Sequence, residues 1–188
     1  LTEVVFSEGK TRSFMCAALS ERKDPTEELI FATNLIKCVM DYMKDKPVLS
    51  SLHVCRGNWS KDESILLKGP YTPLVPLFEE TSPNILTLEF STPRAGELDS
   101  LLSSEKIKEN SILALGVINP RTDVIETAQS IIDRAREALK FISKERLWLN
   151  PDCGFATFSN RPVSTFEIIE KKFEQLQIAK NALREMYE

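Results

Sequence analysis

Apolar residues recur every three or four positions in three stretches of the chain, and this is the spacing of one helical face. Each stretch begins with a helix-start signal, either a proline at the first helical position or an acidic residue three positions after a capping side chain. Three long helices are therefore predicted at Ser20–Met43, at Asp123–Ile142 and from Ser164 onward. Their starts are Asp24-Pro25, Asp123 with Glu126, and Ser164 with Glu167.

Four short apolar runs bounded by turn residues lie among these helical stretches and predict strands. They are Pro47–Val54, Ile85–Phe90, Ser111–Ile118 and Arg146–Asn150. Between them we expect a short helix at Leu98–Ile107, while the proline-rich segment Ser60–Pro83 is expected to be mostly loop, with a short helix around Leu74–Glu80. The residues up to Lys10 are expected to be irregular.

Strands that alternate with helices at intervals of about 30 residues are typical of βαβ units and a parallel sheet. We therefore expect an α/β fold in a single domain that spans residues 1–188. Four strands are too few for a closed barrel of eight, which typically needs about 250 residues. The pattern leaves two architectures open, an open sheet or half of a barrel.

Composition narrows the class of protein. The chain has 188 residues, 42% hydrophobic and 28% charged, and its net charge of -4 offers no basic field to hold a phosphate backbone. Nucleic acid is therefore not an expected partner. Because no stretch approaches the roughly 20 apolar residues of a membrane helix and no leader pattern opens the chain, we expect a cytoplasmic protein without membrane contact. The chain begins with Leu1 rather than methionine, so we expect a fragment or a processed product.

The four cysteines are widely and irregularly spaced, which argues against a disulfide scaffold and favours reduced thiols. Cys38 falls in a predicted helix, and neither it nor Cys16 has a ligand-like neighbour. Cys55 differs because the only histidine of the sequence, His53, lies two residues before it. This pair is therefore the first candidate for metal ligands or a nucleophile.

Potential metal ligands stand at or just after the ends of three predicted strands, where α/β folds place their sites. Residues i and i+2 of a strand share a face, so His53 and Cys55 can converge on one point. With Glu89 and Cys153 they offer one imidazole, two thiolates and one carboxylate, a set that suits zinc and disfavours magnesium or calcium. The alternative is that these residues only stabilise the fold. A histidine at a strand end is often a hydrogen-bonded polar residue without a ligand, and a free cysteine often packs as a small apolar residue.

The order of these motifs resembles the C-terminal barrel of the cobalamin-independent methionine synthase family, especially its shorter single-barrel members. The resemblance runs from about Ser51 to the end of the chain. Its carriers are His53-Val54-Cys55-Arg56-Gly57-Asn58, then Leu88-Glu89-Phe90 followed by Arg94-Ala95-Gly96, then Leu115-Gly116-Val117, and finally the run from Glu145 to Phe155 with Asn150-Pro151-Asp152-Cys153-Gly154.

The resemblance implies that these segments are the last four strands of a TIM-type (β/α)8 barrel, the remainder of which would lie in the full chain or in a second chain. It also implies that His53, Cys55, Glu89 and Cys153 hold Zn²⁺. In such enzymes zinc binds the thiol of homocysteine, which takes a methyl group from a methyl-folate donor to make methionine.

The sequence departs from the family pattern at the end of the third predicted strand. Full-length members carry a histidine there that assists proton transfer, whereas this chain has Ile118-Asn119-Pro120-Arg121. Either another acid serves or the methyl donor differs. The acidic residues that hold the amino group of homocysteine belong to earlier strands of the family barrel, which would precede Leu1. The 188 residues also do not include the large N-terminal domain of the long members.

Several polar side chains beside the predicted ligands are candidates for substrate contact. Arg56, Asn58 and Trp59 follow the His-x-Cys pair in a loop that would line the barrel mouth, although loop packing explains them equally well. Asp152 precedes Cys153 and could orient it, and Arg94 could pair with an acidic neighbour or with substrate.

Two alternatives to methyl transfer to homocysteine stay open: a zinc-dependent alkyltransferase that acts on another thiol, and a non-catalytic relative with structural zinc.

Overall fold

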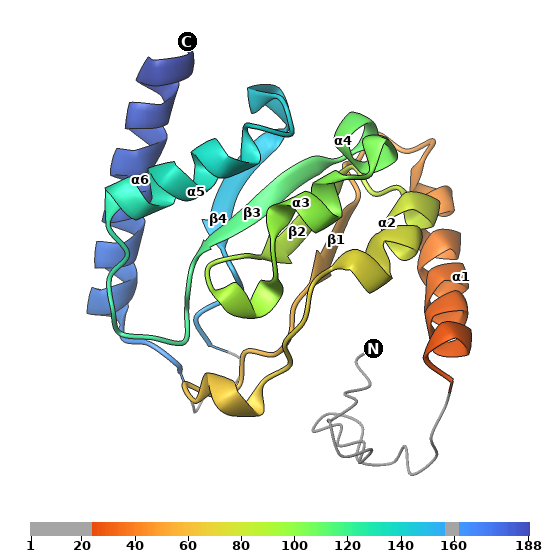
Figure 1. The fold of residues 1–188 in the computed structure, drawn as a ribbon, viewed down its shortest axis with the longest axis horizontal. Helices are drawn as coiled ribbons and strands as arrows, with labels where there is room; N and C mark the ends of the chain where they lie inside the picture. The colour runs from red at the N-terminus through yellow and green to blue at the C-terminus, as the bar shows by residue number, and fades with distance from the viewer. Residues whose placement is uncertain (1–23, 157–161) are drawn as a thin grey trace.

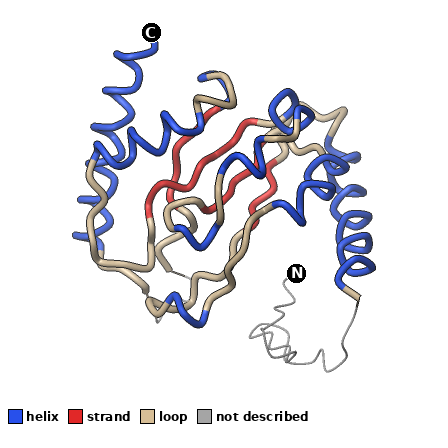
Figure 2. The backbone as a smooth tube through the Cα atoms, viewed as in Figure 1, coloured by secondary structure: helices blue, strands red, loops and turns tan. Residues whose placement is uncertain are grey.

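The computed structural model describes residues 24–156 and 162–188. Within them, four parallel strands form one sheet in chain order, which confirms the α/β class (Figure 2). Each pair of neighbouring strands is parallel, and a bulge interrupts the last pair between Gly116 and Ile118. The strands are β1 (Ser51–Val54), β2 (Ile85–Glu89), β3 (Ile112–Ile118) and β4 (Leu147–Pro151).

The connecting helices lie on one side of this sheet, with α1 beyond the β1 edge and α6 beside β4 (Figure 1). α1 packs against α2, and α5 packs against α6. The helices are α1 (Pro25–Met43), α2 (Val75–Thr81), α3 (Leu98–Leu102), α4 (Glu105–Asn110), α5 (Ala128–Ala138) and α6 (Phe166–Tyr187). Short 3-10 turns occur at Glu63–Ile65, Thr72–Leu74, Pro93–Ala95 and Lys144–Arg146. None of the described helices is long and apolar enough to cross a membrane.

The two faces of the sheet differ in burial because side chains alternate along each strand. Leu88 of β2 and Leu115 of β3 belong to the hydrophobic core and are fully buried. The opposite face carries a row of side chains in register, in which His53 is exposed and Trp148 is 46% exposed. Among the described residues this face lacks a covering layer, as expected for one half of a barrel.

α5 starts five residues later than the sequence predicts, at Ala128 rather than Asp123. Thr127 caps it by accepting the Ser130 backbone N–H at 3.1 Å. Asp123 instead pairs with Lys61 at 2.7 Å, and Glu126 accepts the backbone N–H of Asn119 at 2.8 Å. Tertiary partners thus occupy both carboxylates. The predicted capping box of Asp123 and Glu126 was wrong.

α6 also starts elsewhere than predicted, because Thr165 and not Ser164 is its N-cap. Glu167, the predicted capping-box partner of Ser164, instead pairs with Lys171 at 2.6 Å. The single helix predicted at Leu98–Ile107 is two helices, since Ser104 caps α4 by accepting the Ile107 N–H at 3.2 Å. The Asp24 cap and Pro25 start of α1 are confirmed. The opening segment, Cys16 and the predicted start at Ser20 lie outside the described residues.

Candidate metal centre

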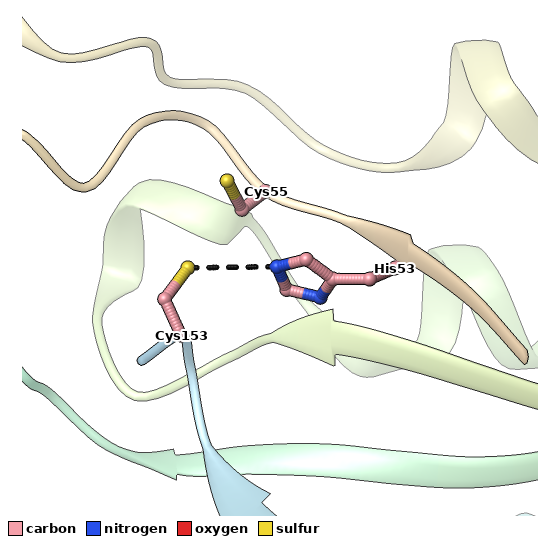
Figure 3. Close-up of side chains that lie close together, drawn as sticks. All are labelled: His53, Cys55 and Cys153. Carbon is pink, nitrogen blue, oxygen red and sulfur yellow. Dashed lines mark hydrogen bonds between the residues drawn. The ribbon is translucent and has the colours of Figure 1, made fainter. Parts of the chain in front are cut away.

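Three of the predicted metal ligands meet at the carboxyl end of the sheet. His53 lies in β1, Cys55 follows that strand directly, and Cys153 comes two residues after β4. Their donor atoms all lie within 4.8 Å of one another, and Cys153 Sγ is 3.6 Å from His53 Nε2. Figure 3 shows the Cys153 sulfur facing the ring nitrogen of His53, with the Cys55 side chain beside them. One nitrogen and two sulfur donors at this separation match the ligands that zinc accepts in proteins.

The ring of His53 is oriented by the neighbouring strand. Its Nδ1 lies 2.9 Å from the backbone carbonyl oxygen of Thr87, the residue opposite His53 in the β1–β2 register. Because a carbonyl can only accept, Nδ1 carries the proton. Nε2 is therefore the ring atom that is left for the sulfur side, and in its unprotonated form it has the orientation that a metal-binding imidazole needs.

The thiols of Cys55 and Cys153 differ in pKa in opposite directions from the ordinary value. The hydrogen bond with Cys153 lowers the pKa of the Cys55 thiol to about 4, with further support from His53 and the Gly57 backbone N–H, while burial opposes the shift. The same hydrogen bond raises the pKa of Cys153, and the contact with Cys55 raises the pKa of His53. Cys55 is thus the thiolate of the pair, and a thiolate is the form of cysteine that binds metals.

Glu89, the fourth predicted ligand, lies outside this close group of donor atoms. Its buried carboxylate accepts the Arg56 backbone N–H at 2.7 Å and the Arg94 guanidinium at 3.0 Å. Arg121 approaches the same carboxylate at 3.7 Å. Burial raises the pKa of Glu89 despite the opposing effect of Arg94. The structure therefore joins His53, Cys55 and Cys153 directly and holds Glu89 among arginines next to them.

The other polar candidates make mostly internal contacts. The buried Arg56 guanidinium lies 3.8 Å from the centre of the Tyr71 ring and contacts Glu89. Asn58 donates to the backbone oxygen of Gly154 at 2.6 Å, and Asp152 is 1% exposed. The Trp59 ring lies so close to Gly57 that a Cβ there would come within 2.3 Å of it.

Arg121 is a member of the site that the residue pattern alone did not identify. This side chain is 1% exposed and binds Asp152 at 2.8 Å and Glu63 at 3.1 Å. Its signal in the sequence is a charged residue three positions after a buried strand, where the family pattern has a histidine nearby. A buried guanidinium needs carboxylate partners, and Asp152 and Glu89 are within its reach.

Comparison with known proteins identifies relatives for most of the chain. Residues 45–168 match the family described as cobalamin-independent synthase, catalytic domain. Over 137 residues, 71% of this chain and 34% of the relative, the sequence is 29% identical to the uncharacterized protein YxjH of Bacillus subtilis. It is 23% identical to the methionine synthase of Pyrococcus horikoshii, covering 74% of this chain and 39% of the relative. It is 24% identical to the 2-hydroxypropyl-CoM lyase of Xanthobacter autotrophicus, covering 66% and 39%.

The fold is similar to that of a solved B12-independent methionine synthase from Shewanella sp. W3-18-1 in complex with selenomethionine. The TM-score is 0.66 at 24% identity, and the match covers 80% of this chain and 43% of the solved chain. The chain thus spans between a third and two fifths of the length of these curated relatives and under half of the solved structure. These proportions agree with half of a TIM-type barrel.

Proposed function

Because the chain belongs to the cobalamin-independent synthase catalytic-domain family, we propose that it supplies the zinc-binding half of a methyltransferase that methylates the thiol of homocysteine. The observation that carries this proposal is the convergence of His53 Nε2 with the sulfur atoms of Cys55 and Cys153 within 4.8 Å. The relative from Pyrococcus horikoshii, a methionine synthase, supports homocysteine as the acceptor. A methyl-folate compound is the proposed donor.

Zinc fits the donor set of this chain. His53, Cys55 and Cys153 would hold it, and Glu89 is the proposed fourth ligand, for which zinc would compete with Arg56 and Arg94. When bound, zinc would favour the thiolate form of the acceptor, whose free thiol has a pKa near 8.5 and is a poor nucleophile until deprotonated.

The residues of the chain have separate tasks in this proposal. The Thr87 carbonyl keeps the proton of His53 on Nδ1, so that Nε2 faces the sulfur atoms. The Arg56 and Arg94 side chains compensate the buried charge of Glu89, which would otherwise be costly at this depth. Arg121 does the same for Asp152 beside Cys153.

We further propose that residues 1–188 form one domain, the C-terminal portion of a (β/α)8 barrel, and that four more βα units cover the open side of the sheet. β1 and β4 are each paired on one side only among the described residues. Apolar side chains of β4 and α6 line a groove of about 650 Å³ beside the free edge of β4. An exposed parallel edge next to apolar surface needs a covering partner.

A second candidate is an alkyltransferase that acts on a different thiol. The observation in its favour is the similarity to a lyase whose name includes coenzyme M. The three donor residues are compatible with either acceptor, because they specify a thiolate and not which thiol carries it. A structural zinc is the third possibility.

X-ray absorption at the zinc K-edge of the purified natural protein, with and without added homocysteine or coenzyme M, tests the proposal. We expect one zinc per chain and an additional sulfur neighbour when homocysteine is added. A rise only with coenzyme M would favour the second candidate. If neither thiol changes the number of sulfur neighbours of zinc, the ion is structural. Absence of zinc would refute the metal site.

A further inference from the structure

The convergence of His53 and Cys153 is unexpected from the order of the strands. β1 and β4 are the outer strands of the sheet, with β2 and β3 between them. Three inter-strand spacings place the ends of β1 and β4 about 14 Å apart in a flat sheet. Cys153 Sγ is nevertheless 3.6 Å from His53 Nε2. The curvature of a half barrel shortens this span. The segment after β4 is also held against the end of β3, because the Asp152 backbone N–H donates to the Ile118 carbonyl oxygen at 2.9 Å.

Asp152 supplies the first contact, at the end of β2. Its Oδ1 accepts the backbone N–H groups of Phe90 and Ser91, each at 3.0 Å. Its Oδ2 accepts from the Ser91 hydroxyl and from Arg121 Nη2 at 2.8 Å. This buried carboxylate belongs to the residue before Cys153. It thus binds the backbone directly after β2, across the intervening strand β3. Charge-assisted bonds of this kind are among the stronger ones in proteins.

The contact depends on the lack of a side chain at Gly116 of β3, which lies between Asp152 and β2. A Cβ added at residue 116 would lie 2.4 Å from Asp152 Oδ1 and 2.7 Å from the Leu88 carbonyl oxygen. Real Cβ atoms essentially never approach so closely. Because one obstacle is backbone, a side chain at this position would push the Asp152 carboxylate away from β2.

Asn58 supplies the second contact, at the β1 side. Its Nδ2 donates to the Gly154 carbonyl oxygen at 2.6 Å, which links the loop after Cys55 to the residue after Cys153. Asp152 and Asn58 therefore hold the residues on either side of Cys153, one toward β2 and one toward the loop after β1.

We propose that Asp152, Asn58 and Gly116 are positioning residues that carry Cys153 across the sheet to His53 and Cys55. The effect of these residues on zinc binding rests on the proposed function. Their effect on the distance between the thiols of Cys55 and Cys153 does not. Neither Asp152 nor Asn58 is needed as a ligand. Both act by fixing the place of Cys153, so that the site exists before any metal binds.

The test compares Gly116→Ala with Gly154→Ala in the natural protein. The second variant adds the same methyl group beside Cys153, and it keeps the backbone oxygen that Asn58 binds. Apart from its two chain neighbours, no atom of the described residues lies within 4 Å of a Cβ added at Gly154. Zinc affinity is measured by competition with a chromophoric chelator. Capture of phenylarsine oxide, which bridges two nearby thiols, is measured on metal-free protein. We expect Gly116→Ala to weaken zinc binding by about 10- to 100-fold and to slow arsenical capture at least several-fold, with Gly154→Ala unchanged in both.

Asn58→Ala and Asp152→Asn keep the test decisive if Gly116→Ala fails to fold, and Asn110→Ala on the exposed surface of α4 is their control. Wild-type zinc affinity and wild-type arsenical capture in both Asn58→Ala and Asp152→Asn would overturn the inference. A natural protein that captures the arsenical but binds no zinc would refute the proposed metal function alone, and slower capture in the variants would still support the positioning role.

Discussion

At the scale of single residues, the site depends on which atom each side chain turns toward the centre. His53 presents Nε2 because a backbone carbonyl of the next strand holds Nδ1. Glu89 is turned toward arginines, so its carboxylate is compensated without a metal. The sequence shows the residue types at strand ends, but it does not show which partners compete for each atom.

Replacing Cys153 by serine should weaken zinc binding by more than about 100-fold, because loss of an outer partner of a ligand alone typically costs 10- to 100-fold. Cys38→Ser is the matched control, since Cys38 is exposed on α1 and away from the ligand group. Isothermal titration of zinc into metal-free protein measures both variants. Equal loss in the two variants would show that cysteine removal acts on the fold and not on the site.

Glu63→Gln should change how stability depends on pH. Burial alone would raise the pKa of Glu63, but hydrogen bonds from Asn119 and Arg121 outweigh it and lower the pKa below its ordinary value of 4.5. The folded state therefore binds fewer protons than the unfolded state, so the stabilisation is present above about pH 4.5 and is lost as the pH falls through the lowered pKa. Because this side chain is partly exposed, the effect at pH 7 should not exceed about 1 kcal/mol.

Urea unfolding at pH 7 and at pH 3 measures this difference. We expect the variant to be less stable than the wild type at pH 7 and nearly equal to it at pH 3. A constant difference at both values would mean that Glu63 acts through packing and not through its charge.

At the scale of elements, tertiary contacts decide where the helices begin. Thr165→Ala should destabilise the protein by about 1 kcal/mol, because Thr165 accepts the Ile168 N–H at the start of α6. Ser164→Ala is the contrast: its buried hydroxyl has no hydrogen-bond partner among the described residues, so its loss should cost little. Urea denaturation compares them, and a larger loss for Ser164→Ala would restore the cap that the sequence predicted.

Lys172 attaches α6 to the loop between β3 and α5. Its fully buried Nζ donates to the carbonyl oxygens of Asn119 and Val124 and to Glu126 at 2.8 Å. Lys172→Met should lower the free energy of unfolding by about 3 kcal/mol, because it leaves Glu126 without its buried cation. Lys171→Met, on the exposed side of the same helix, should cost less than about 0.5 kcal/mol. Similar losses for the two variants would contradict a special role for Lys172.

At the scale of the whole molecule, the open side of the sheet predicts a larger particle than one 21.3 kDa chain. We expect the natural protein either to have a larger denatured mass, with the remaining βα units in the same polypeptide, or to assemble with a second chain. Mass spectrometry under denaturing and native conditions distinguishes these two outcomes. A monodisperse particle of 21.3 kDa that unfolds cooperatively would refute the half-barrel proposal.

Patterns along the chain were enough to predict the α/β class, the four strands, most of the helices and the residue types of the site. These features depend on local periodicity and on the position of polar residues at strand ends, and both can be read along the chain. The shift of the α5 start from Asp123 to Ala128 shows the limit of local signals, because Lys61 and Asn119 compete for the carboxylates of the predicted cap.

How Cys153 reaches His53, and which side chains surround Glu89, is visible only in the folded chain. The side chains around Glu89 are Arg56, Arg94 and Arg121. The approach of Cys153 to His53 depends on the Asp152 carboxylate crossing β3 above Gly116, between segments far apart in the chain. No local pattern encodes such a contact, because its energy arises only when strands separated by dozens of residues lie side by side. Hydrogen bonds and charge pairs depend on distance in space, whereas periodicity depends on distance along the chain.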